Sequence, residues 1–497
     1  MKINIKPFRR NLKKIKEILY RVPIEGVLGS TSCMVTDIAL DSRDVIKNSM
    51  FVAIKGSEKD GHDYIDKALA SGASSVVCEQ LPKELNQEIV YVQVNDSRVA
   101  LGYMAANFYE TPSSHLKLVG VTGTNGKTTV ATLLFDLFNN IKKKAGLIST
   151  VAIKYDDKDF VSTHTTPNPI TINKHLRAMV DSGVSHCFME VSSHGIDQKR
   201  ITGLAFAGAI FSNLTHDHLD YHSSFKHYRD TKKKLFDSIN KNGFALTNID
   251  DKNGRIMLQN CEGKKQTYAM HRYADFKVKV LEHQFNGMLL KINQNEIWTQ
   301  ILGEFNAYNL LAVYATSQLL GEDELLCLKA VSQLKNVPGR FQTYQTKNGI
   351  MLVVDYAHTP DALKNVLKSI NKIRTQNESL YTIIGCGGNR DQEKRPLMGC
   401  TAASLSSKVI FTSDNPRYED PDQIIEEINA GVKPIDYKKT ISIPQRREAI
   451  KLACQMSKPG DIILIAGKGH ENYQEIRGER YPFDDYEIAK EIFSKIL

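Results

Sequence analysis

A glycine-rich segment that ends in lysine and threonine constrains the fold of this chain more than any other feature. The segment GVTGTNGKTT spans Gly120–Thr129 and lies between an apolar stretch and a helical pattern. Glycines let the backbone curl so that N–H groups and a helix N-terminus face phosphate oxygens, lysine adds a mobile positive charge, and the threonine hydroxyl suits Mg²⁺. Val121 replaces the first glycine of the strict G-x-x-x-x-G-K-S/T pattern. We predict a phosphate-binding strand–loop–helix unit with Gly123, Thr124, Asn125, Gly126, Lys127, Thr128 and Thr129.

Short apolar runs alternate with helical patterns on the C-terminal side of this unit. Such alternation is typical of a parallel sheet covered by helices. Strands are expected at 116–121, 185–191, 207–212 and 244–248, and helices near 306–320 and 324–334. Residues 266–303 are broken by Asn286-Gly287 and Asn293-Gln294, which predicts a few appended antiparallel strands.

The chain is too long for one hydrophobic core. Its 497 residues, at roughly 150 per domain, predict about three domains. Turn and linker residues near 111–114 and 336–340 suggest boundaries there. The expected domains are a small α/β domain over 1–113, the central phosphate-binding domain over 114–338, and a Rossmann-like α/β domain over 339–497. In the last domain, strands are expected at 350–355, 380–385, 408–413 and 461–466, with a final helix at 485–496.

Composition excludes several classes of protein. The 65 Lys+Arg and 56 Asp+Glu are spread along the chain, which favours anionic small molecules over nucleic acid as partners. The eight cysteines form no C-x-x-C pair, so neither a zinc ribbon nor a disulfide framework is predicted. No stretch approaches the ~20 apolar residues of a membrane span. A cytoplasmic protein without membrane insertion is expected. Its basic start is interpreted as a native helix, with Leu12, Ile15, Ile18 and Leu19 on one apolar face, and not as a transit peptide.

Three further places carry residues suited to chemistry. Glu190 ends a core strand on the same side of the sheet as the phosphate loop, where a metal ligand would lie, although a strand-end glutamate in solvent is the plainer alternative. Histidines and acids crowd together in 216–222, which favours metal or phosphate chemistry, with zinc less favoured for want of a thiolate. Lys232 begins a run of three lysines, which by itself reads as a solvated helix face.

Taken together, the motifs resemble those of the Mur ligases, the ATP-dependent amide-forming enzymes of peptidoglycan synthesis, a pathway tied to cell shape and division. The resemblance covers nearly the whole chain in order. It is carried by Leu40–Arg43, Gly123–Thr129, Thr165–Pro167, Glu190–Gly195, His216–Tyr221, Gly303–Asn309, Pro338–Phe341, Asp355–Pro360, Gly387–Arg390, Asp414–Arg417 and Gly467–Glu471.

The resemblance implies ATP as co-substrate and Mg²⁺ as cofactor. Lys127 would hold the β- and γ-phosphates, Thr128 one Mg²⁺, and Glu190 with His218 the second. Lys232 aligns with the family's carbamylated lysine (N6-carboxylysine), whose anionic oxygens suit a hard cation. Catalytic roles are thus implied for Lys127, Glu190, His218 and Lys232, and further nucleotide contacts for Asn306, Arg340 and Asp355.

The resemblance also implies the other two substrates, UDP-N-acetylmuramoyl-L-alanyl-D-glutamate and meso-2,6-diaminopimelate. The first would contact Leu40, Ser42, Thr165, Thr166, Ser192, Gln198 and Arg200, and His164 departs from the family pattern. The second would contact Arg390, Asp414, Asn415, Pro416, Arg417, Gly467 and Glu471. The planar guanidinium of Arg417 suits the distal carboxylate, and Glu471 suits the distal ammonium. Asp414–Pro416 as a mere turn after a strand is the plainer alternative.

The expected function is ligation of diaminopimelate to this dipeptide through an acyl phosphate, by a protein that is expected to be a monomer. Three alternatives stay open: a lysine-adding version of the same ligase, a ligase resembling folylpolyglutamate synthetase, and an inactive structural protein that keeps the ligase fold. Lysine lacks the distal carboxylate, so a buried Arg417 would face its ammonium with like charge. The roles of His164 and His358 are left open.

Overall fold

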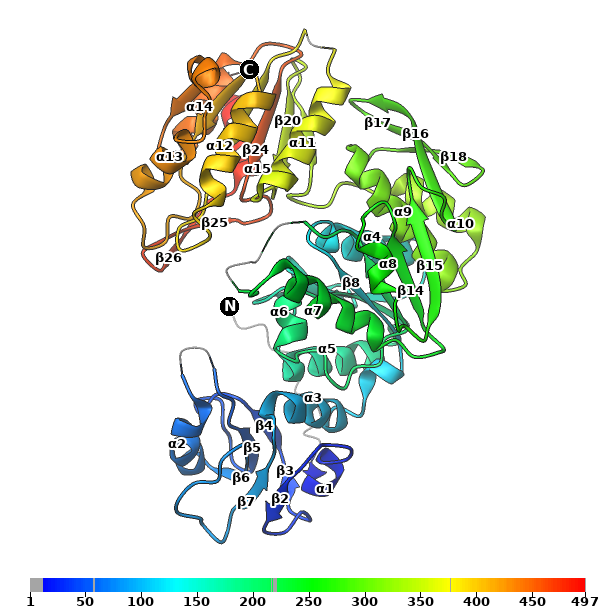
Figure 1. Cartoon of the computed structure of the whole chain (residues 1–497), viewed down its shortest axis with the longest axis vertical. Helices are drawn as coiled ribbons and strands as arrows, with labels where there is room; N and C mark the ends of the chain where they lie inside the picture. The colour runs from blue at the N-terminus through cyan, green and yellow to red at the C-terminus, as the bar shows by residue number, and fades with distance from the viewer. Residues whose placement is uncertain (1–11, 57–58, 216, 218–220, 376, 497) are drawn as a thin grey trace.

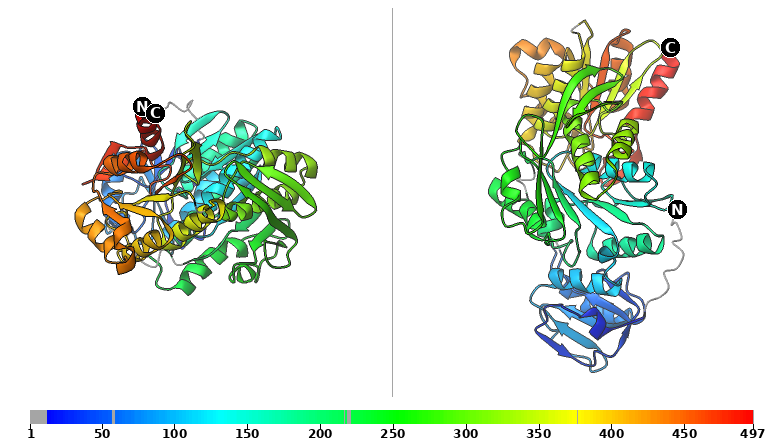
Figure 2. Two further views of the ribbon diagram at one scale, coloured as in Figure 1. Left: turned by 90° about the horizontal axis from the view of Figure 1, so that it is seen from above. Right: turned by 90° about the vertical axis from the view of Figure 1, so that its right-hand side faces the viewer.

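The three-domain α/β architecture is seen in the arrangement of the large sheets. The computed structural model describes residues 12–56, 59–215, 217, 221–375 and 377–496. In this part of the chain three large sheets of five, eleven and six strands follow one another. The body that holds the N-terminal sheet lies at one end of the molecule, and the body that holds the C-terminal sheet lies at the other (Figures 1 and 2). None of the described helices is both long and apolar enough to cross a membrane.

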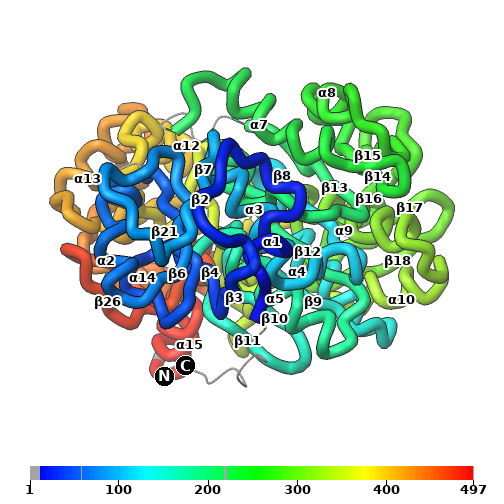
Figure 3. The backbone as a smooth tube through the Cα atoms, turned by 90° about the horizontal axis from the view of Figure 1, so that it is seen from below, coloured from blue at the N-terminus to red at the C-terminus, as the bar shows by residue number. Residues whose placement is uncertain are grey.

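The N-terminal sheet has the strand order β2-β7-β6-β5-β4, in which only β2 runs antiparallel to its neighbour. Its body consists of β1 (Lys13–Lys14), α1 (Ile15–Ile18), β2 (Gly26–Leu28), β3 (Met34–Val35), β4 (Asp37–Ala39), β5 (Ser49–Val52), η1 (Gly61–Tyr64), α2 (Ile65–Ala70), β6 (Ala73–Cys78), β7 (Val90–Gln93) and α3 (Ser97–Phe108). These elements enclose an apolar core of their own. In Figure 3 this body lies nearest the viewer.

The expected first helix is only partly correct. Ile15, Ile18 and Leu19 are buried as predicted, but Leu12 is 53% exposed. The helix α1 has four residues, because the chain before it is extended and pairs through β1 with β3. The apolar spacing that predicted a helix therefore starts at Leu12, three residues before the helix itself begins.

The central sheet has the order β11-β10-β9-β12-β8-β13-β14-β15-β16-β17-β18. Leu118 and Val119 of β8 enter different apolar clusters, since side chains alternate along a strand, so the sheet is buried on both faces. The elements are η2 (Pro112–Ser114), β8 (Lys117–Thr122), α4 (Lys127–Asn140), β9 (Ala145–Ile148), β10 (Ala152–Tyr155), β11 (Lys158–Val161), α5 (Pro169–Asp181), β12 (His186–Glu190), α6 (Ser193–Asp197), β13 (Gly208–Phe211), α7 (Phe225–Asp237), β14 (Phe244–Asn248), α8 (Gly254–Met257), β15 (Lys264–Ala269), β16 (Phe276–Gln284), β17 (Gly287–Ile292), β18 (Asn295–Thr299), α9 (Glu304–Leu319) and α10 (Glu324–Gln333).

Two parts of this sheet differ from the sequence prediction. The appended antiparallel strands are β16, β17 and β18, but β15 pairs in parallel with both β14 and β16. At the other edge, β10 and β11 form a hairpin that the sequence analysis missed. Asp156 and Asp157 both have positive φ in its turn, so this pair of aspartates was the available signal for a two-residue hairpin loop.

The C-terminal sheet has the order β19-β20-β24-β21-β22-β23, with only β19 antiparallel. A separate hairpin, β25–β26, follows β24. The elements are β19 (Gln342–Gln345), β20 (Met351–Asp355), α11 (Pro360–Ile373), β21 (Leu380–Ile384), α12 (Lys394–Leu405), β22 (Lys408–Phe411), α13 (Pro421–Asn429), η3 (Pro434–Lys439), β23 (Thr440–Ser442), α14 (Arg446–Met456), β24 (Ile462–Ala466), β25 (Tyr473–Ile476), β26 (Glu479–Pro482) and α15 (Asp485–Ile496). The loops after the parallel strands β21, β22 and β24 all start from the carboxyl ends of these strands, which is where open α/β sheets bind ligands.

All eight cysteines are free, which agrees with the absence of a predicted disulfide framework.

The N-terminal body meets the central one backbone to backbone. A Cβ on Gly102 of α3 would lie 2.7 Å from the carbonyl oxygen of Thr202. A Cβ on Gly203 would lie 2.9 Å from the carbonyl oxygen of Gly102. Glycine at both positions therefore allows α3 to pack directly on this turn.

Candidate active site

The glycine-rich segment forms the loop between β8 and α4, as the sequence predicted. Gly123 and Gly126 have φ of 147° and 90°, in the region that favours glycine. A Cβ on Gly123 would lie 2.0 Å from Ser212 Oγ, and one on Gly126 would lie 2.7 Å from Asn309 Oδ1. The loop also joins the end of β13, because the Thr124 N–H donates to the Asn213 carbonyl at 2.8 Å. The curl of this loop is therefore set by local φ values and by the neighbouring strand.

Lys127 is held at this loop. Its Nζ donates to the carbonyl oxygens of Gly123 and Thr124 at 3.0 and 2.7 Å. Burial lowers the pKa of Lys127, while the negative charges of Glu190 and Asp217 oppose that shift. The side chain thus lies where a ligand of the phosphates is expected.

Glu190 lies at the end of β12, beside β8, and is fully buried, so a solvent-exposed strand-end glutamate is ruled out. Its Oε2 accepts a hydrogen bond from Thr128 Oγ1 at 3.0 Å, and its Oε1 accepts one from the Thr150 N–H at 2.8 Å. Arg340 Nη2, from the segment before β19, donates to the same Thr128 hydroxyl at 3.1 Å. Hydroxyl and carboxylate oxygens therefore meet at the phosphate loop.

These oxygen donors fit Mg²⁺, a hard cation that keeps several waters and uses few protein ligands. Over the described ranges, no group of three or more His, Cys, Asp or Glu side chains could by itself enclose a metal ion. His218, the histidine predicted to bind metal, lies outside the described residues.

Lys232 lies on α7 and points into the protein. It is 1% exposed, whereas Lys234 is exposed, so only part of the lysine run is a solvated face. Its Nζ donates to the Gly123 carbonyl at 2.9 Å and lies 4.7 Å from the centre of the Tyr228 ring. Burial, reinforced by the charge of Lys127, lowers the pKa of Lys232 well below its ordinary value. The lowered pKa favours the neutral amine, which is the form of lysine that reacts with CO₂.

A cavity of about 700 Å³ lies over the phosphate loop and reaches from the central body to the C-terminal body. Lining residues include Thr124–Thr129, Thr150, Thr165, Glu190, Asp217, Asp250, Asn309, Arg340, Asp355 and His358. Asp355 accepts hydrogen bonds from the N–H groups of Phe341 and Ala357, both at 2.7 Å, and burial raises its pKa to about 6. Thr128 and Glu190, both predicted to bind metal, thus line one cavity together with the predicted phosphate residues and with Arg340 and Asp355, whereas Lys232 does not line it.

Asn306 is the exception among the predicted nucleotide residues. Its Nδ2 donates to the Leu302 carbonyl at 2.7 Å, and its Oδ1 accepts from Asn309 Nδ2 at 2.8 Å. Asn306 is not among the residues that line the cavity, whereas Asn309, one helical turn later on α9, is. The structure therefore places Asn306 behind Asn309.

Residues predicted to bind the dipeptide form one network beside Glu190. Thr166 Oγ1 donates to the Glu190 carbonyl and accepts from the Ser192 N–H, both at 3.0 Å. Arg200 Nη1 donates to the Thr166 carbonyl at 2.6 Å, and its Nη2 donates to Gln198 Oε1 at 2.7 Å. Thr165 lines the cavity.

The predicted nucleotide-sugar residues lie apart from this network. Leu40 and Ser42 follow β4 in the N-terminal body, where Leu40 is half-buried and Ser42 is buried. His164 is exposed. The binding residues expected for one substrate are thus spread over two bodies of the molecule.

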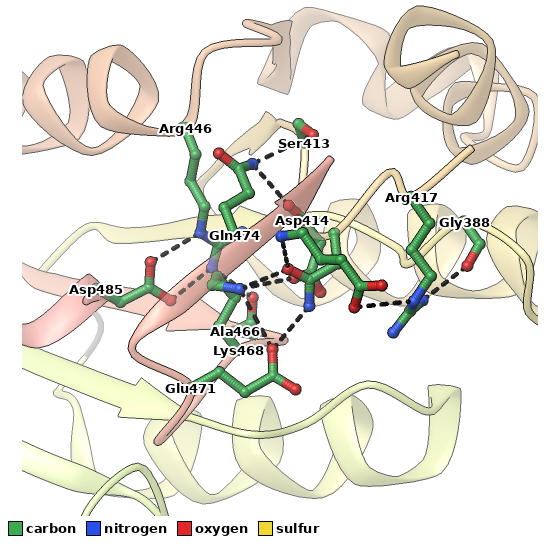
Figure 4. Close-up of polar contacts among 12 residues, drawn as sticks. Gly388, Ser413, Asp414, Arg417, Arg446, Ala466, Lys468, Glu471, Gln474 and Asp485 are labelled. Atoms are coloured by element: carbon green, nitrogen blue, oxygen red, sulfur yellow. Dashed lines mark hydrogen bonds and ion pairs between the residues drawn. The ribbon is translucent and has the colours of Figure 1, made fainter. Parts of the chain in front are cut away.

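Six of the seven predicted diaminopimelate residues follow β22 or β24 in the C-terminal body, and Figure 4 shows three of them, Asp414, Arg417 and Glu471. Arg417 Nη1 donates to the Gly388 carbonyl at 2.7 Å, and its Nε lies 3.6 Å from Glu475 Oε2. The hairpin β25–β26 fixes its backbone, since the Arg417 N–H donates to the Glu475 carbonyl and the Arg417 carbonyl accepts from the Arg477 N–H. Arg390 is exposed on the loop after β21.

The loops after β21 and β22 pack closely against each other. A Cβ on Gly388 would lie 2.0 Å from the Pro416 carbonyl oxygen, and one on Gly467 would lie 3.0 Å from Asp414 Oδ2. Hydrogen bonds join Asn415 and Glu471 to each other and to Lys468, and Asp414 Oδ1 lies 3.5 Å from Lys468 Nζ. None of the seven predicted residues lines the cavity over the phosphate loop.

The sequence analysis gave no role to several residues that the structure places in these sites: Asp250, Asn309, His358 and Lys468. Asp250 follows the carboxyl end of β14, so the strand-end rule that identified Glu190 was available for it as well. It accepts hydrogen bonds from the N–H groups of Met270 and His271 and from Tyr308. Burial lowers the pKa of His358 to about 4.

Comparisons with known proteins agree with the motif resemblance over the whole length of the chain. Three family models match: "Mur ligase family, catalytic domain" at 35–109, "Mur ligase middle domain" at 121–317 and "Mur ligase, glutamate ligase domain" at 339–469. The UDP-N-acetylmuramoyl-L-alanyl-D-glutamate--2,6-diaminopimelate ligase of Bacteroides fragilis is 51% identical over 481 residues, which cover 97% of this chain and 99% of that protein.

Solved structures show the same fold. A structure titled as a UDP-N-acetylmuramoyl-L-alanyl-D-glutamate--2,6-diaminopimelate ligase is 31% identical, with a TM-score of 0.69, over 98% of this chain and 99% of that chain. The MurF ligase from Thermotoga maritima in complex with ADP is 19% identical, with a TM-score of 0.63, over 92% of this chain and 97% of that chain. The second likeness shows the fold alone.

Proposed function

From the premise that this chain belongs to the Mur ligase family, we propose that it joins meso-2,6-diaminopimelate to UDP-N-acetylmuramoyl-L-alanyl-D-glutamate in peptidoglycan synthesis. The chain is an ATP-dependent ligase that forms an amide bond. The identity to the Bacteroides fragilis ligase over nearly the whole of both chains supports the choice of substrates. We further propose three domains, 1–113, 114–338 and 339–497, that bind the nucleotide sugar, ATP and the amino acid respectively.

The proposed reaction has two steps. One of the two free carboxylates of the D-glutamyl residue attacks the γ-phosphorus of ATP, which gives an acyl phosphate and ADP. The amine of diaminopimelate then attacks the acyl carbon, the C–N bond forms, and phosphate leaves with a proton released. Activation is needed because a carboxylate and an amine do not condense in water.

Lys127 binds the β- and γ-phosphates in this proposal, next to the N–H groups of the loop. Thr128, Glu190, His218 and the carbamate of Lys232 would hold Mg²⁺, which offsets the charge of a carboxylate that approaches a triphosphate. Asp355 and Arg340 contact the nucleoside part of ATP in the cavity. The neutral state favoured for Lys232 by burial supports the carbamate, because only the free amine captures CO₂.

The dipeptide part of the substrate reaches the network of Thr165, Thr166, Ser192, Gln198 and Arg200, which adjoins Glu190. Leu40 and Ser42 bind the uridine diphosphate end in the N-terminal domain. Because the amino-acid residues stand apart from the nucleotide cavity, closure of the C-terminal domain would bring the amine to the acyl phosphate and exclude water. We propose that the protein acts as a cytoplasmic monomer.

The residues around Arg417 determine the specificity for diaminopimelate over lysine. Arg417 and Asp414 follow β22 and Glu471 follows β24, so a planar cation and two acids lie at one edge of the sheet. This combination suits a distal head with one carboxylate and one ammonium. Diaminopimelate has both groups, and lysine has only the ammonium.

A panel of amino acids tests the proposal. Formation of ADP is measured with ATP, Mg²⁺ and the UDP-linked dipeptide, with diaminopimelate, lysine or no amino acid added, and in parallel with a folate acceptor and glutamate in place of the dipeptide. Strong turnover with diaminopimelate and weak turnover with lysine are expected. Turnover with lysine alone would remove the role of Arg417, turnover with a folate acceptor alone would move the chain to another branch of ligases, and no turnover with any acceptor would favour an inactive structural protein.

A further inference from the structure

We propose that Lys468 is a positioning residue that holds the acidic wall of the amino-acid pocket in its charged, substrate-binding arrangement. The inference rests on the proposed function, because it takes Asp414, Asn415 and Glu471 as the contacts of the incoming amino acid. Lys468 lies directly after Gly467, at the carboxyl end of β24, and its side chain is 0% exposed. It therefore acts from behind the residues that meet the substrate.

One ammonium group binds all three of these residues (Figure 4). Lys468 Nζ donates to Asn415 Oδ1 at 3.0 Å and to Glu471 Oε2 at 3.3 Å, and it lies 3.5 Å from Asp414 Oδ1. Asp414 Oδ1 is buried and accepts no hydrogen bond, so this ion pair is the contact that offsets its charge.

Lys468 also decides which way the Asn415 amide points. Asn415 Oδ1 accepts from Lys468 and from the Glu475 N–H at 2.9 Å, while Nδ2 donates to Glu471 Oε2 at 2.8 Å. A rotated amide would set its NH₂ group against the ammonium and the backbone N–H. Lys468, the Glu475 N–H and Glu471 thus select the same orientation of Asn415.

The charge balance explains why a buried lysine is needed at this place. Asp414 and Glu471 bring two carboxylates into one buried group, and burial together with the charge of Asp414 raises the pKa of Glu471. Lys468 opposes that rise. Arg446, the next cation along, forms a bidentate ion pair with Asp485, and the charges of Asp414 and Glu471 affect the pKa of Arg446 less than the charge of Asp485 does. With Lys468 present, the group keeps one net negative charge, which fits one substrate ammonium.

The test replaces the cation and then restores it. In Lys468→Met we expect KM for the amino acid to rise roughly 10- to 100-fold, in line with the loss of hydrogen bonds between charged groups, while KM for ATP stays near its wild-type value. Lys451→Met, an exposed lysine of α14, is the matched control. Lys468→Ala leaves space for a small alkylammonium ion, so propylammonium should restore formation of the diaminopimelate product, and propanol, similar in size but neutral, should not.

The first half-reaction separates a positioning role from general damage. Hydroxylamine traps the acyl phosphate as a hydroxamate without any amino acid, and this yield should stay within about twofold of wild type in Lys468→Met. An unchanged KM for the amino acid, equal rescue by propanol, or a parallel loss of the hydroxamate would each overturn the proposal. If wild type rejects diaminopimelate, the proposed function fails, and Lys468 is then tested with the amino acid that wild type accepts.

Discussion

Replacing Asp485 by Asn will loosen the C-terminal sheet and leave the central sheet unchanged. Arg446 of α14 and Asp485 of α15 are fully buried, with Nε–Oδ1 and Nη2–Oδ2 distances of 2.8 and 2.7 Å. Arg446 Nη2 also donates to the Ala466 carbonyl at the end of β24, next to the amino-acid pocket. The substitution leaves a guanidinium buried without its counter-charge.

The magnitude follows from burial. Removing one partner of a buried ion pair costs about 3–5 kcal/mol, whereas an exposed pair contributes about 0–1 kcal/mol. The same two helices carry an exposed pair one residue away, Arg447 with Glu491 at 2.8 Å, with side chains 47% and 42% exposed. Glu491→Gln is therefore the exposed counterpart on the same two helices; it also removes the exposed pair of Glu491 with Lys495. Since about 1.4 kcal/mol equals a factor of ten, Asp485→Asn should speed opening of the sheet roughly a hundredfold to several thousandfold.

Hydrogen–deuterium exchange of the full chain measures this opening strand by strand. Peptides from β20 and β24 should exchange faster in Asp485→Asn, while peptides from β8 and β12 should not change. The only tryptophan, Trp298, lies in β18, so its fluorescence reports the central sheet during urea unfolding and should keep its midpoint.

A double variant completes the cycle. Arg446→Met with Asp485→Leu removes both charges, so it should recover most of the lost protection. Equal exchange of β24 in Asp485→Asn and Glu491→Gln would refute the reasoning, and so would a double variant no better than the single one.

Three further predictions concern the nucleotide site. Lys232→Ala should lose nearly all turnover and regain part of it with added acetate or formate, and removal of CO₂ should slow the wild type; full unassisted activity of the variant would contradict a carbamate. Glu190→Gln should raise the Mg²⁺ concentration needed for half-maximal ADP formation at least tenfold, and an unchanged Mg²⁺ titration would argue against metal binding there. Burial raises the pKa of Asp355 from 3.8 to about 6, so ATP affinity should fall as pH drops through about 6. The folded state binds this proton more tightly than the unfolded chain. Its stability should therefore fall as pH rises from about 3.8 to about 6. Titration of ATP between pH 5 and about 7.5 checks this sign, and Asp355→Asn should remove both effects.

The sequence by itself determined the features that depend on neighbouring residues. The curl of the loop at Gly123 and Gly126 follows from positive φ, which glycine adopts without strain. Alternating apolar and helical patterns located the parallel strands β8, β12, β13 and β14 of the central sheet and β20, β21, β22 and β24 of the C-terminal sheet, but not β9 or β23. The strand-end rule located Glu190. Such signals are local, so they can be read along the chain.

Tertiary structure decided which side chains are buried and which charges they meet. Three consecutive lysines look alike in sequence, but only Lys232 is placed against the Gly123 carbonyl and Tyr228. Likewise, the role proposed for Lys468 depends on its hydrogen bond to Asn415, which lies 53 residues earlier in the chain. Burial and charge partners depend on segments that folding brings together, because desolvation and Coulomb energies depend on distances in space and not on spacing along the chain.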